Sequence, residues 1–358
     1  MTDVLSPLTF ARGPAMKNRF ALAPLTNCQS HADGTLSAVE EHWLDMRAGA
    51  GFGMTMTCAA HVVPSGQTFP GQLAIFDDRF VDGLSRLARR INGHGSVSIV
   101  QLHHGGKRCP AALVGQPVAP SDDSAAGARA LTLAEIEEVI EGFGAAAARA
   151  ERAGFHGVEV HGAHGYLIAQ FLSASANERT DRYGGSLENR ARLLLEVLRR
   201  VRARTGRDFM LGVRLSPERF GMRLEEIRDL ATEVMRGGGI DFLDASLWDY
   251  AKAPIEEGFG GSLIQLFADL PRGDVRMCCA GSILTGADVR KAMEAGMDFV
   301  MLGKAAMLHH DFVQRYIEDP NFASRTSPVP EALLRAEGMS DPFLDYLRGF
   351  PNSIVATV

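Results

Sequence analysis

The chain contains 358 residues, of which 46% are hydrophobic and 22% are charged. These proportions are those of globular domains, so they support a large core and argue against extended disorder. The 37 basic and 43 acidic residues give a formal net charge of −6, which argues against the basic stripe of a nucleic-acid-binding domain. No apolar run approaches the roughly 18 residues of a membrane span, and no charged-then-apolar leader opens the chain. We therefore expect a cytoplasmic protein that binds neither nucleic acid nor membrane.

Eight short apolar runs alternate with longer amphipathic stretches along the chain. The runs cover residues 20–25, 54–60, 97–102, 158–161, 210–215, 242–247, 275–280 and 299–302. The stretches predicted as helices cover residues 38–48, 78–92, 133–153, 187–204, 224–236, 262–270 and 287–294. Eight buried strands that alternate with helices predict a single (β/α)8 barrel over residues 1–358. An open doubly wound sheet is the competing fold, but its usual G-x-G-x-x-G turn is absent after Leu25 and Ala60.

Local signals support these helices, and two segments fall outside the repeat. Residues 37–40 and 132–135 have the S/T-x-x-E pattern of a capping box at a helix start. An irregular insertion, residues 109–129, follows the third strand and is rich in Pro, Gly, Ser and Asp, so we expect a loop or hairpin there. The pattern loosens over the last segment, residues 307–358, which we expect to pack on the barrel or on a partner subunit.

The cysteines argue against a metal site. There are five, and no two of them form a C-x-x-C pair, the spacing typical of structural zinc and iron–sulfur sites. Cys278 and Cys279 are adjacent within an apolar run, which indicates that they fill a buried strand. We therefore expect reduced cysteines and no bound metal.

Polar residues lie within or just after the predicted strands, near the ends where barrels carry their active groups. Arg214 lies in the apolar strand 210–215, where its charge is costly unless it meets an anion or another strong acceptor. Gln101 lies in the strand 97–102, and its amide can recognise a ring that carries both donors and acceptors. Both positions indicate a polar ligand at the mouth of the barrel.

The fourth strand ends in the most informative stretch of the sequence, residues 157–166. It carries His161, His164 and Tyr166. Two imidazole donors can hold a developing oxyanion, and a phenol beside them can deliver a proton. This combination suits the reduction of an activated double bond, provided that hydride is supplied nearby. A lone buried histidine usually only satisfies backbone groups, but two histidines with a tyrosine favour a function.

The seventh and eighth strands are each followed by a glycine turn. Gly281-Ser282 and Gly303-Lys304 offer backbone N–H groups, a hydroxyl and an ammonium at the loops where barrels commonly bind phosphate. Either glycine alone could simply serve a tight turn. The two turns together predict a phosphate site.

These motifs resemble those of the old yellow enzyme family, flavin-dependent ene-reductases on a (β/α)8 barrel that carries FMN. The similarity runs over residues 17–312. It is most specific in the His-x-x-His-x-Tyr motif of residues 161–166 and in residues 179–190, which follow it. The turns at 280–282 and 302–304 match the family's phosphate site.

The resemblance implies non-covalent FMN, NADPH or NADH as reductant, and transfer of hydride from flavin N5 to an activated C=C bond of an enone, enal, nitroalkene or maleimide. By position, His161 and His164 would hold the substrate's oxygen and Tyr166 would donate the proton. A tyrosine of reference pKa about 10 stays protonated near neutrality and can act as a general acid. The flavin-binding residues would be Pro24, Thr26, Ala59, Gln101 and Arg214 at the ring, with Gly281, Ser282, Gly303 and Lys304 at the phosphate.

The chain departs from the family pattern after its first strand and near its C-terminus. Thr26 stands where one bacterial branch has a redox-tuning cysteine, and Cys28 stands where that branch has a substrate-facing tyrosine. Trp248 and Tyr250, which follow the sixth strand, are expected to wall the pocket. Arg348 lies in a Leu-Arg-Gly-Phe segment that resembles the C-terminus of that branch, where the arginine enters a neighbouring subunit's site. The resemblance therefore implies substrate contacts from these residues and a homo-oligomer.

Other functions remain open from the residues alone. A flavin-dependent amine or N-methyl dehydrogenase on the same scaffold is the nearest alternative, although His161 and His164 favour a reductase that binds an oxyanion. A flavin-free phosphosugar enzyme that uses Lys304 is a second alternative, but it leaves Arg214 and Gln101 unexplained. A non-catalytic binding protein has no need of a proton donor beside two oxyanion donors.

Overall fold

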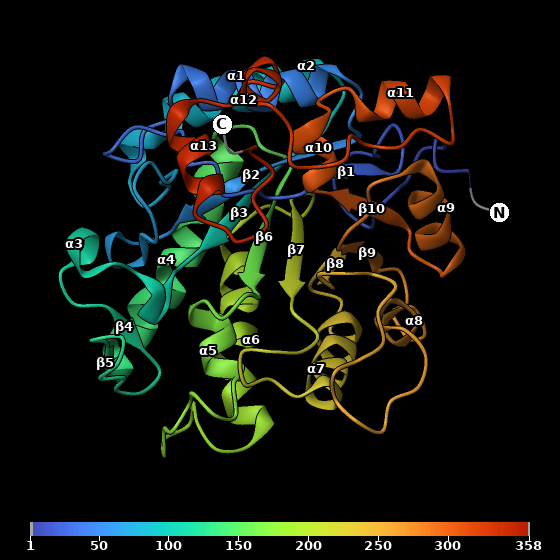
Figure 1. Cartoon of the computed structure of the whole chain (residues 1–358). Helices are drawn as coiled ribbons and strands as arrows, with labels where there is room; N and C mark the ends of the chain where they lie inside the picture. The colour runs from blue at the N-terminus through green and yellow to red at the C-terminus, as the bar shows by residue number, and fades with distance from the viewer. Residues whose placement is uncertain (1–2, 357–358) are drawn as a thin grey trace.

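Eight parallel strands close into a barrel in the computed structural model, which describes residues 3–356 (Figure 1). The hydrogen-bonded order around the barrel is β1-β10-β9-β8-β7-β6-β3-β2. The strands are β1 (Phe20–Leu22), β2 (Met54–His61), β3 (Val97–His103), β6 (Gly157–Gly162), β7 (Met210–Leu215), β8 (Phe242–Ser246), β9 (Arg276–Ala280) and β10 (Phe299–Leu302). The predicted (β/α)8 barrel is therefore confirmed.

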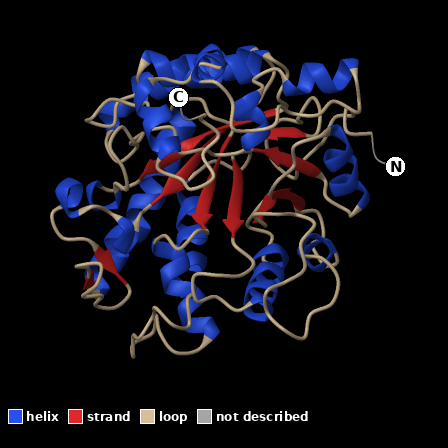
Figure 2. Cartoon of the chain, viewed as in Figure 1, coloured by secondary structure: helices blue, strands red, loops and turns tan. Residues whose placement is uncertain are grey.

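Helices surround this barrel (Figure 2). Those that cover predicted ranges are α1 (Ala38–Gly49), α2 (Val81–Gly93), α4 (Leu133–Arg152), α6 (Leu187–Arg204), α7 (Leu224–Arg236), α8 (Leu263–Ala268) and α9 (Gly286–Glu294). The predicted helix at 78–92 begins with a 3-10 turn, Asp78–Phe80, before α2. Two short helices, α5 (Leu167–Leu172) and α10 (Lys304–Leu308), follow β6 and β10 directly. No helix within residues 3–356 is long and apolar enough to cross a membrane.

One of the two predicted capping boxes is present. At the start of α4, Thr132 Oγ1 accepts from the Glu135 backbone N at 3.2 Å, and Glu135 Oε2 accepts from the Thr132 backbone N at 2.8 Å. At the start of α1, Ser37 Oγ accepts from the Glu40 backbone N at 3.1 Å, but the return bond is missing. The Glu40 carboxylate is buried and binds the loop after β1 instead. The prediction of a capping box at residues 37–40 is therefore wrong.

The barrel has an apolar interior that is separate from the larger core between strands and helices. Side chains alternate along each strand, so Ile99 and Met210 point inward from the lower halves of β3 and β7. Phe10 closes the lower end, with its ring centroid 6.3 Å from that of Phe242 and 6.0 Å from that of Phe299. The buried polar side chains Gln101, Glu159, Arg214 and Asp244 lie farther along the strands, toward their carboxyl ends.

The insertion after β3 is ordered. It contains α3 (Ala111–Val114) and two short strands, β4 (Val118–Ala119) and β5 (Arg129–Ala130), which pair with each other. A tight antiparallel turn, bridged between Asp123 and Ala128, lies between the two strands. The insertion predicted after the third strand as a loop or hairpin is confirmed, and its two short strands pair in parallel as a small separate sheet.

The tail after β10 packs on its own barrel through α11 (Phe312–Glu318), α12 (Glu331–Ala336) and α13 (Asp341–Arg348). In Figure 1 the red α12 and α13 lie beside the blue α1. Phe343 stacks edge-on against Trp43 of α1, with 5.7 Å between ring centroids. The Ser340 backbone N donates to Gln29 Oε1 at 2.9 Å. The tail is therefore anchored next to the loop that follows β1.

Candidate active site

Three predicted catalytic residues meet at the end of β6. His161 is in the strand, His164 follows with a left-handed backbone (φ 61°), and Tyr166 precedes the first residue of α5. The ring centroid of His161 lies 5.0 Å from that of His164 and 5.1 Å from that of Tyr166. The structure therefore places the two imidazoles and the phenol side by side.

The two imidazoles are part of a directional hydrogen-bond chain. The Ala163 backbone N donates to His161 Nδ1 at 3.3 Å, so a neutral His161 carries its proton on Nε2. His161 Nε2 lies 3.2 Å from His164 Nδ1, and His164 Nε2 lies 2.7 Å from Ser246 Oγ. The protons therefore run from His161 to His164 and from His164 to Ser246.

Both N–H groups of the histidine pair are bonded within the protein. The sequence predicted these imidazoles as donors to a substrate oxygen, and such an oxygen would have to replace one of these bonds. Burial is the main cause that lowers the pKa of both rings, and the positive charge of Arg214 acts in the same direction. Both rings are therefore neutral at physiological pH.

Tyr166 lies beneath a cation. The Arg108 guanidinium carbon is 4.5 Å from the centre of the Tyr166 ring, and Arg108 Nη1 donates to the His164 carbonyl at 2.6 Å. Burial raises the pKa of Tyr166, and the charge of Arg108 opposes that rise. The phenol consequently keeps its proton near neutral pH, while its phenolate would have a positive neighbour.

His103, to which the sequence assigned no role, completes the aromatic cluster. Its ring centroid lies 4.4 Å from that of Tyr166 and 5.2 Å from that of His161, both edge-on. His103 Nε2 is 2.7 Å from Thr68 Oγ1. Its place at the end of the third strand was visible in the sequence, but its neighbours were not.

The loop after β1 brings Pro24, Thr26 and Cys28 to the same end of the barrel, all partly exposed. Glu40 holds this loop from below, because its carboxylate accepts from Asn27 Nδ2 at 3.1 Å. Burial, assisted by the charge of Glu40, raises the pKa of the Cys28 thiol to about 12. Cys28 is therefore a neutral thiol and not a nucleophile at neutral pH.

Tyr346 of α13 reaches this loop, and the sequence gave no signal of it. Burial raises its pKa to about 12, and the nearby Thr26 side chain opposes the rise. Its ring packs against Phe69, with 6.5 Å between centroids. The tail of the same chain therefore supplies a phenol next to Thr26 and Cys28.

A charged layer lies inside the barrel just below the histidines. Gln101 on β3 is register-paired with Glu159 on β6, and Arg214 on β7 with Asp244 on β8. Gln101 Nε2 donates to Glu159 Oε1 at 2.7 Å, and Arg214 Nε lies 3.0 Å from Asp244 Oδ2. The Arg214 contact is an ion pair without hydrogen-bond alignment. Within the described part of the chain, Gln101 Oε1 and Arg214 Nη1 have no partner.

Ala59 lies beside this layer. It is register-paired with Gln101 and is 8% exposed. Gln72 Nε2 donates to the Ala59 carbonyl at 2.8 Å. Gln72 therefore fixes the backbone at Ala59, and the small Ala59 side chain fills little of the space next to Gln101.

The predicted phosphate turns lie at the ends of β9 and β10. A Cβ on Gly281 (φ 152°) would approach the Trp248 carbonyl carbon to 2.9 Å, so only glycine fits there. Lys304 is exposed at the first position of α10, directly after Gly303. Ser282 Oγ donates to the Trp248 carbonyl at 3.0 Å. The hydroxyl predicted as a free phosphate donor is therefore engaged within the protein.

The remaining candidates divide. Trp248 is 49% exposed, and its ring centroid lies 6.0 Å from that of His164, as expected for a pocket wall. Tyr250 is 7% exposed and donates its hydroxyl to Asp288 Oδ1 at 3.0 Å. Its hydroxyl is therefore engaged with α9, and its place in the pocket wall stays a prediction.

Arg348 is on the surface of the chain. It pairs with Glu331 and, at 2.7 Å, with Asp345 Oδ1. It makes no ion pair or hydrogen bond with a predicted site residue inside residues 3–356. Its entry into a neighbouring subunit stays a prediction.

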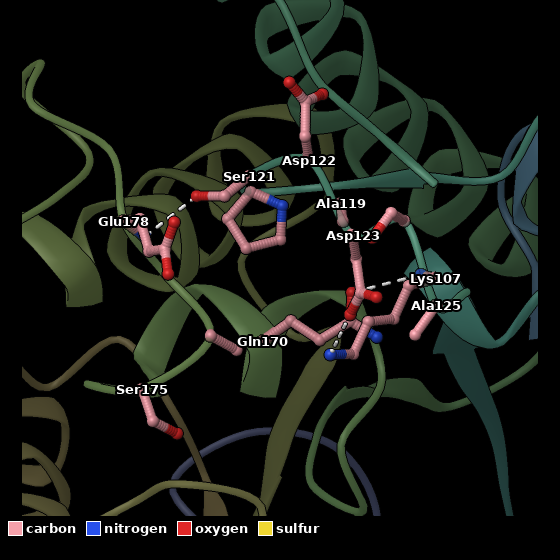
Figure 3. A pocket seen from close by; sticks show the side chains of 12 residues that line it. Lys107, Ala119, Ser121, Asp122, Asp123, Ala125, Gln170, Ser175 and Glu178 are labelled. Atoms are coloured by element: carbon pink, nitrogen blue, oxygen red, sulfur yellow. Dashed lines mark hydrogen bonds and ion pairs between the residues drawn. The ribbon is translucent and has the colours of Figure 1, made fainter. Parts of the chain in front are cut away.

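A polar pocket of about 340 Å³ lies between the insertion and the segment after α5 (Figure 3). Lys107 Nζ pairs across it with Asp123 Oδ2 at 2.7 Å, and Ser121 Oγ accepts from the Glu178 backbone N at 2.8 Å. Gln170 Nε2 donates to the Gly165 carbonyl at 2.8 Å. Gln170 Oε1 also accepts from the Lys107 backbone N at 3.1 Å, so Lys107 and Gln170 link Asp123 of the insertion to the loop that carries Tyr166.

Comparison with known proteins agrees with this geometry. The sequence pattern of the NADH:flavin oxidoreductase / NADH oxidase family matches residues 3–315. The chain is 38% identical to YqiG of Bacillus subtilis, a probable NADH-dependent flavin oxidoreductase, with 85% of each chain covered. It is also 38% identical to an NADPH dehydrogenase of Halalkalibacterium halodurans, over 68% of this chain and 73% of that one. A solved structure of an old yellow enzyme homologue from Zymomonas mobilis has a TM-score of 0.80 and 26% identity, covering 95% of this chain and 99% of the other.

The fold and the strand-end site thus define a flavin-dependent oxidoreductase on a (β/α)8 barrel. The chain belongs to the NADH:flavin oxidoreductase / NADH oxidase family, that is, the old yellow enzyme family, and is an NAD(P)H-dependent flavin oxidoreductase. The flavin-free phosphosugar enzyme that the sequence left open is thereby ruled out.

Proposed function

We propose that this enzyme binds FMN non-covalently at the mouth of the barrel and uses NADH or NADPH to reduce an activated C=C bond. Enones, enals, nitroalkenes and maleimides are the acceptor classes, and Tyr166 is the proton donor. One observation carries the proposal. A neutral histidine pair and a protonated tyrosine lie together at the end of β6, directly above interior side chains with unused polar atoms.

The residues present fit FMN. Gln101 Oε1 offers an acceptor and Arg214 Nη1 offers a donor, which suits a ring edge that carries both an N–H group and carbonyl oxygens. The turns at Gly281 and Gly303 would hold the phosphate, with Lys304 beside them. Bound FMN would supply the hydride acceptor and donor. Ala59, the register partner of Gln101, would line its ring together with Pro24 and Thr26 from the loop after β1.

The histidine pair would bind the substrate's oxygen. An oxygen that enters between the two rings replaces the 3.2 Å bond between His161 Nε2 and His164 Nδ1. His161 then donates its Nε2–H to the oxygen. Neutral imidazole donors in a buried site stabilise the negative charge that develops on that oxygen during reduction.

Tyr166 would deliver the proton to the carbon next to the one that receives hydride. Burial keeps the phenol protonated until the transfer. Arg108, 4.5 Å from the ring centre, favours the phenolate that remains afterwards. Trp248, beside His164, would wall the acceptor's side of the pocket.

The FMN content of the purified protein tests the proposal. We expect FMN to be released on denaturation, and we expect Lys304→Ala to weaken FMN retention without loss of fold. Lys291→Ala, which removes an exposed lysine on α9, is the matched control and should retain FMN normally. A colourless wild-type protein that added FMN does not reconstitute would contradict the proposal.

A further inference from the structure

Two carboxyl groups inside the barrel compete for one cation. Glu159 and Asp244 are both 0% exposed, and Arg214, at 5%, is the cation that faces them. Asp244 is the register partner of Arg214, with 3.0 Å between Oδ2 and Nε. Glu159 is the register partner of Gln101, whose neutral amide is its only hydrogen-bond donor among residues 3–356.

Several oxygens of the two acids lack hydrogen bonds. In the part of the chain that the structure describes, Glu159 Oε2 and both carboxylate oxygens of Asp244 are buried and accept no hydrogen bond. A buried carboxylate without donors is costly, and a second one beside it adds repulsion. If both acids were ionised, this layer would carry a net charge of −1 away from water; if one is protonated, the layer is neutral.

The geometry indicates which acid keeps the proton. Asp244 lies beside the guanidinium, which favours its ionised form. Glu159 has only an amide as donor, and a carboxyl that is protonated on Oε2 still accepts from Gln101 Nε2 through Oε1. Two interacting acids of this kind titrate as a pair.

We propose that Glu159 and Asp244 share one proton, held on Glu159 at neutral pH, and that Glu159 is thereby the positioning residue for Gln101 and Arg214. By holding Nε2, Glu159 turns the amide of Gln101 so that Oε1 stays free. By staying neutral, it leaves the positive charge of Arg214 balanced by Asp244 alone. The consequence for a bound flavin rests on the function proposed above; the shared proton does not.

The groups that face Glu159 all agree with this assignment. They are Gln101 from β3, Arg214 from β7, Asp244 from β8 and the buried thiol of Cys278 from β9. Burial is the main cause that raises the pKa of Glu159, with repulsion from Asp244 next and Arg214 and Gln101 opposing. Burial also raises the pKa of Asp244, and Arg214 opposes that rise. Burial keeps Cys278 in its neutral form.

The proton can be observed directly by infrared difference spectroscopy of the protein as purified. At neutral pH, the spectrum of wild type minus Glu159→Gln should show the carbonyl stretch of a protonated carboxylic acid. Asp244→Asn should lose the same band, because Glu159 becomes the only partner of Arg214 and ionises. A wild-type band that Glu159→Gln leaves unchanged, or no band at all, would overturn the shared proton.

The effect on the flavin is a second, separate readout. Ionisation of Glu159 at higher pH adds a negative charge near Arg214, which lowers the tendency of a flavin bound there to accept electrons. The midpoint potential of the FMN-loaded protein should therefore fall more steeply with pH in the wild type than in Glu159→Gln. Asp298→Asn is the charge-matched control, because Asp298 precedes β10 at the opposite end of the barrel, and it should keep the wild-type slope.

The two readouts separate the inference from the proposed function. A protein with the infrared band but no flavin would contradict the function and leave the shared proton standing. A flavin-loaded protein whose potential has the same pH slope in wild type and Glu159→Gln would overturn the positioning role and leave the function standing. If Glu159→Gln does not fold, Asp244→Asn and a pH titration of the wild-type band test the proton instead.

Discussion

Ser246 determines what His164 can do. Ser246 Oγ accepts a hydrogen bond from His164 Nε2 at 2.7 Å and another from Arg214 Nη2 at 3.3 Å. A serine hydroxyl both donates and accepts, so it can turn and donate to Nε2 when His164 moves its proton to Nδ1. This change of tautomer would give the proposed substrate site its second donor. Ser246 also links the histidine pair to Arg214 in the charged layer below.

Removal of this hydroxyl should weaken oxyanion binding. In Ser246→Ala, one ring nitrogen of His164 is left buried without a partner when an anionic oxygen binds. That costs about 1–3 kcal/mol, on the order of tenfold or more in Kd for a phenolate ligand. Ser246→Thr retains the hydroxyl and should bind close to wild type. Equal phenolate affinity in wild type and Ser246→Ala would show that His164 does not depend on Ser246.

At the scale of elements, α13 is a wall of the active site as well as a cover for α1. Phe343 is fully buried against Trp43, and three residues later Tyr346 meets Thr26. Because the two side chains share one helix, the docking of the tail and the shape of the pocket are coupled.

Phe343→Ala should undock the tail. Loss of a buried phenylalanine costs roughly 3–5 kcal/mol, and we expect hydrogen exchange of the amides of α13 to accelerate far more than that of the barrel strands. Substrate KM should change, because Tyr346 leaves the pocket with the helix. Ile317→Ala, which truncates a 55% exposed side chain on α11 of the same tail, is the control and should do neither. Unchanged exchange of α13 in Phe343→Ala would contradict this account of the tail.

The elements were predictable where local pattern determines them. Apolar periodicity placed the eight strands and their helices, because a buried parallel strand needs a continuous apolar run. It did not show that β1 ends at Leu22. It also did not show that the Glu40 carboxylate binds the loop after β1 and makes no capping bond at the start of α1. Those outcomes depend on which distant residue offers a better partner, which the local sequence does not record.

The site divides in the same way. The two histidines, Tyr166 and Arg214 could be predicted because polar and charged side chains are unusual within or directly after an apolar strand. The argument used for Arg214, a charge within an apolar strand, also applies to Glu159 in Val-Glu-Val and to Asp244 in Leu-Asp-Ala, and it would have found both. Tyr346 had no such signal, because only the docked tail brings it to Thr26.

At the scale of the whole molecule, buried histidines make stability depend on pH. Burial lowers the pKa of seven histidines: His61 and His309 to about 4, His104 to about 3, His156 below its usual value, and His103, His161 and His164 well below 6.5. A group with a depressed folded pKa contributes stability above its unfolded pKa and loses it as pH falls toward the folded value. Each histidine can therefore remove about 1.4 kcal/mol per pH unit below about 6.5.

Buried acids act in the opposite sense. The raised pKa values of Glu40, Glu159 and Asp244 stabilise the fold as pH falls, since the folded state keeps protons that the unfolded chain releases. Because the histidines outnumber these acids, we expect a net loss of unfolding free energy between pH 7 and pH 5, measured as a lower urea midpoint. A midpoint that is constant or higher at pH 5 would contradict the neutral, buried state of the histidines.

The division of roles between the histidine pair and Tyr166 is the central claim, and a stopped-flow comparison of Tyr166→Phe with the wild type tests it most directly. Flavin reduction by NADH or NADPH needs no proton from the phenol, so its rate should stay nearly unchanged. Reoxidation by an enone should slow by roughly 10²–10⁴, the usual contribution of a positioned general acid. An equal loss in both half-reactions, or no loss in reoxidation, would contradict Tyr166 as the proton donor.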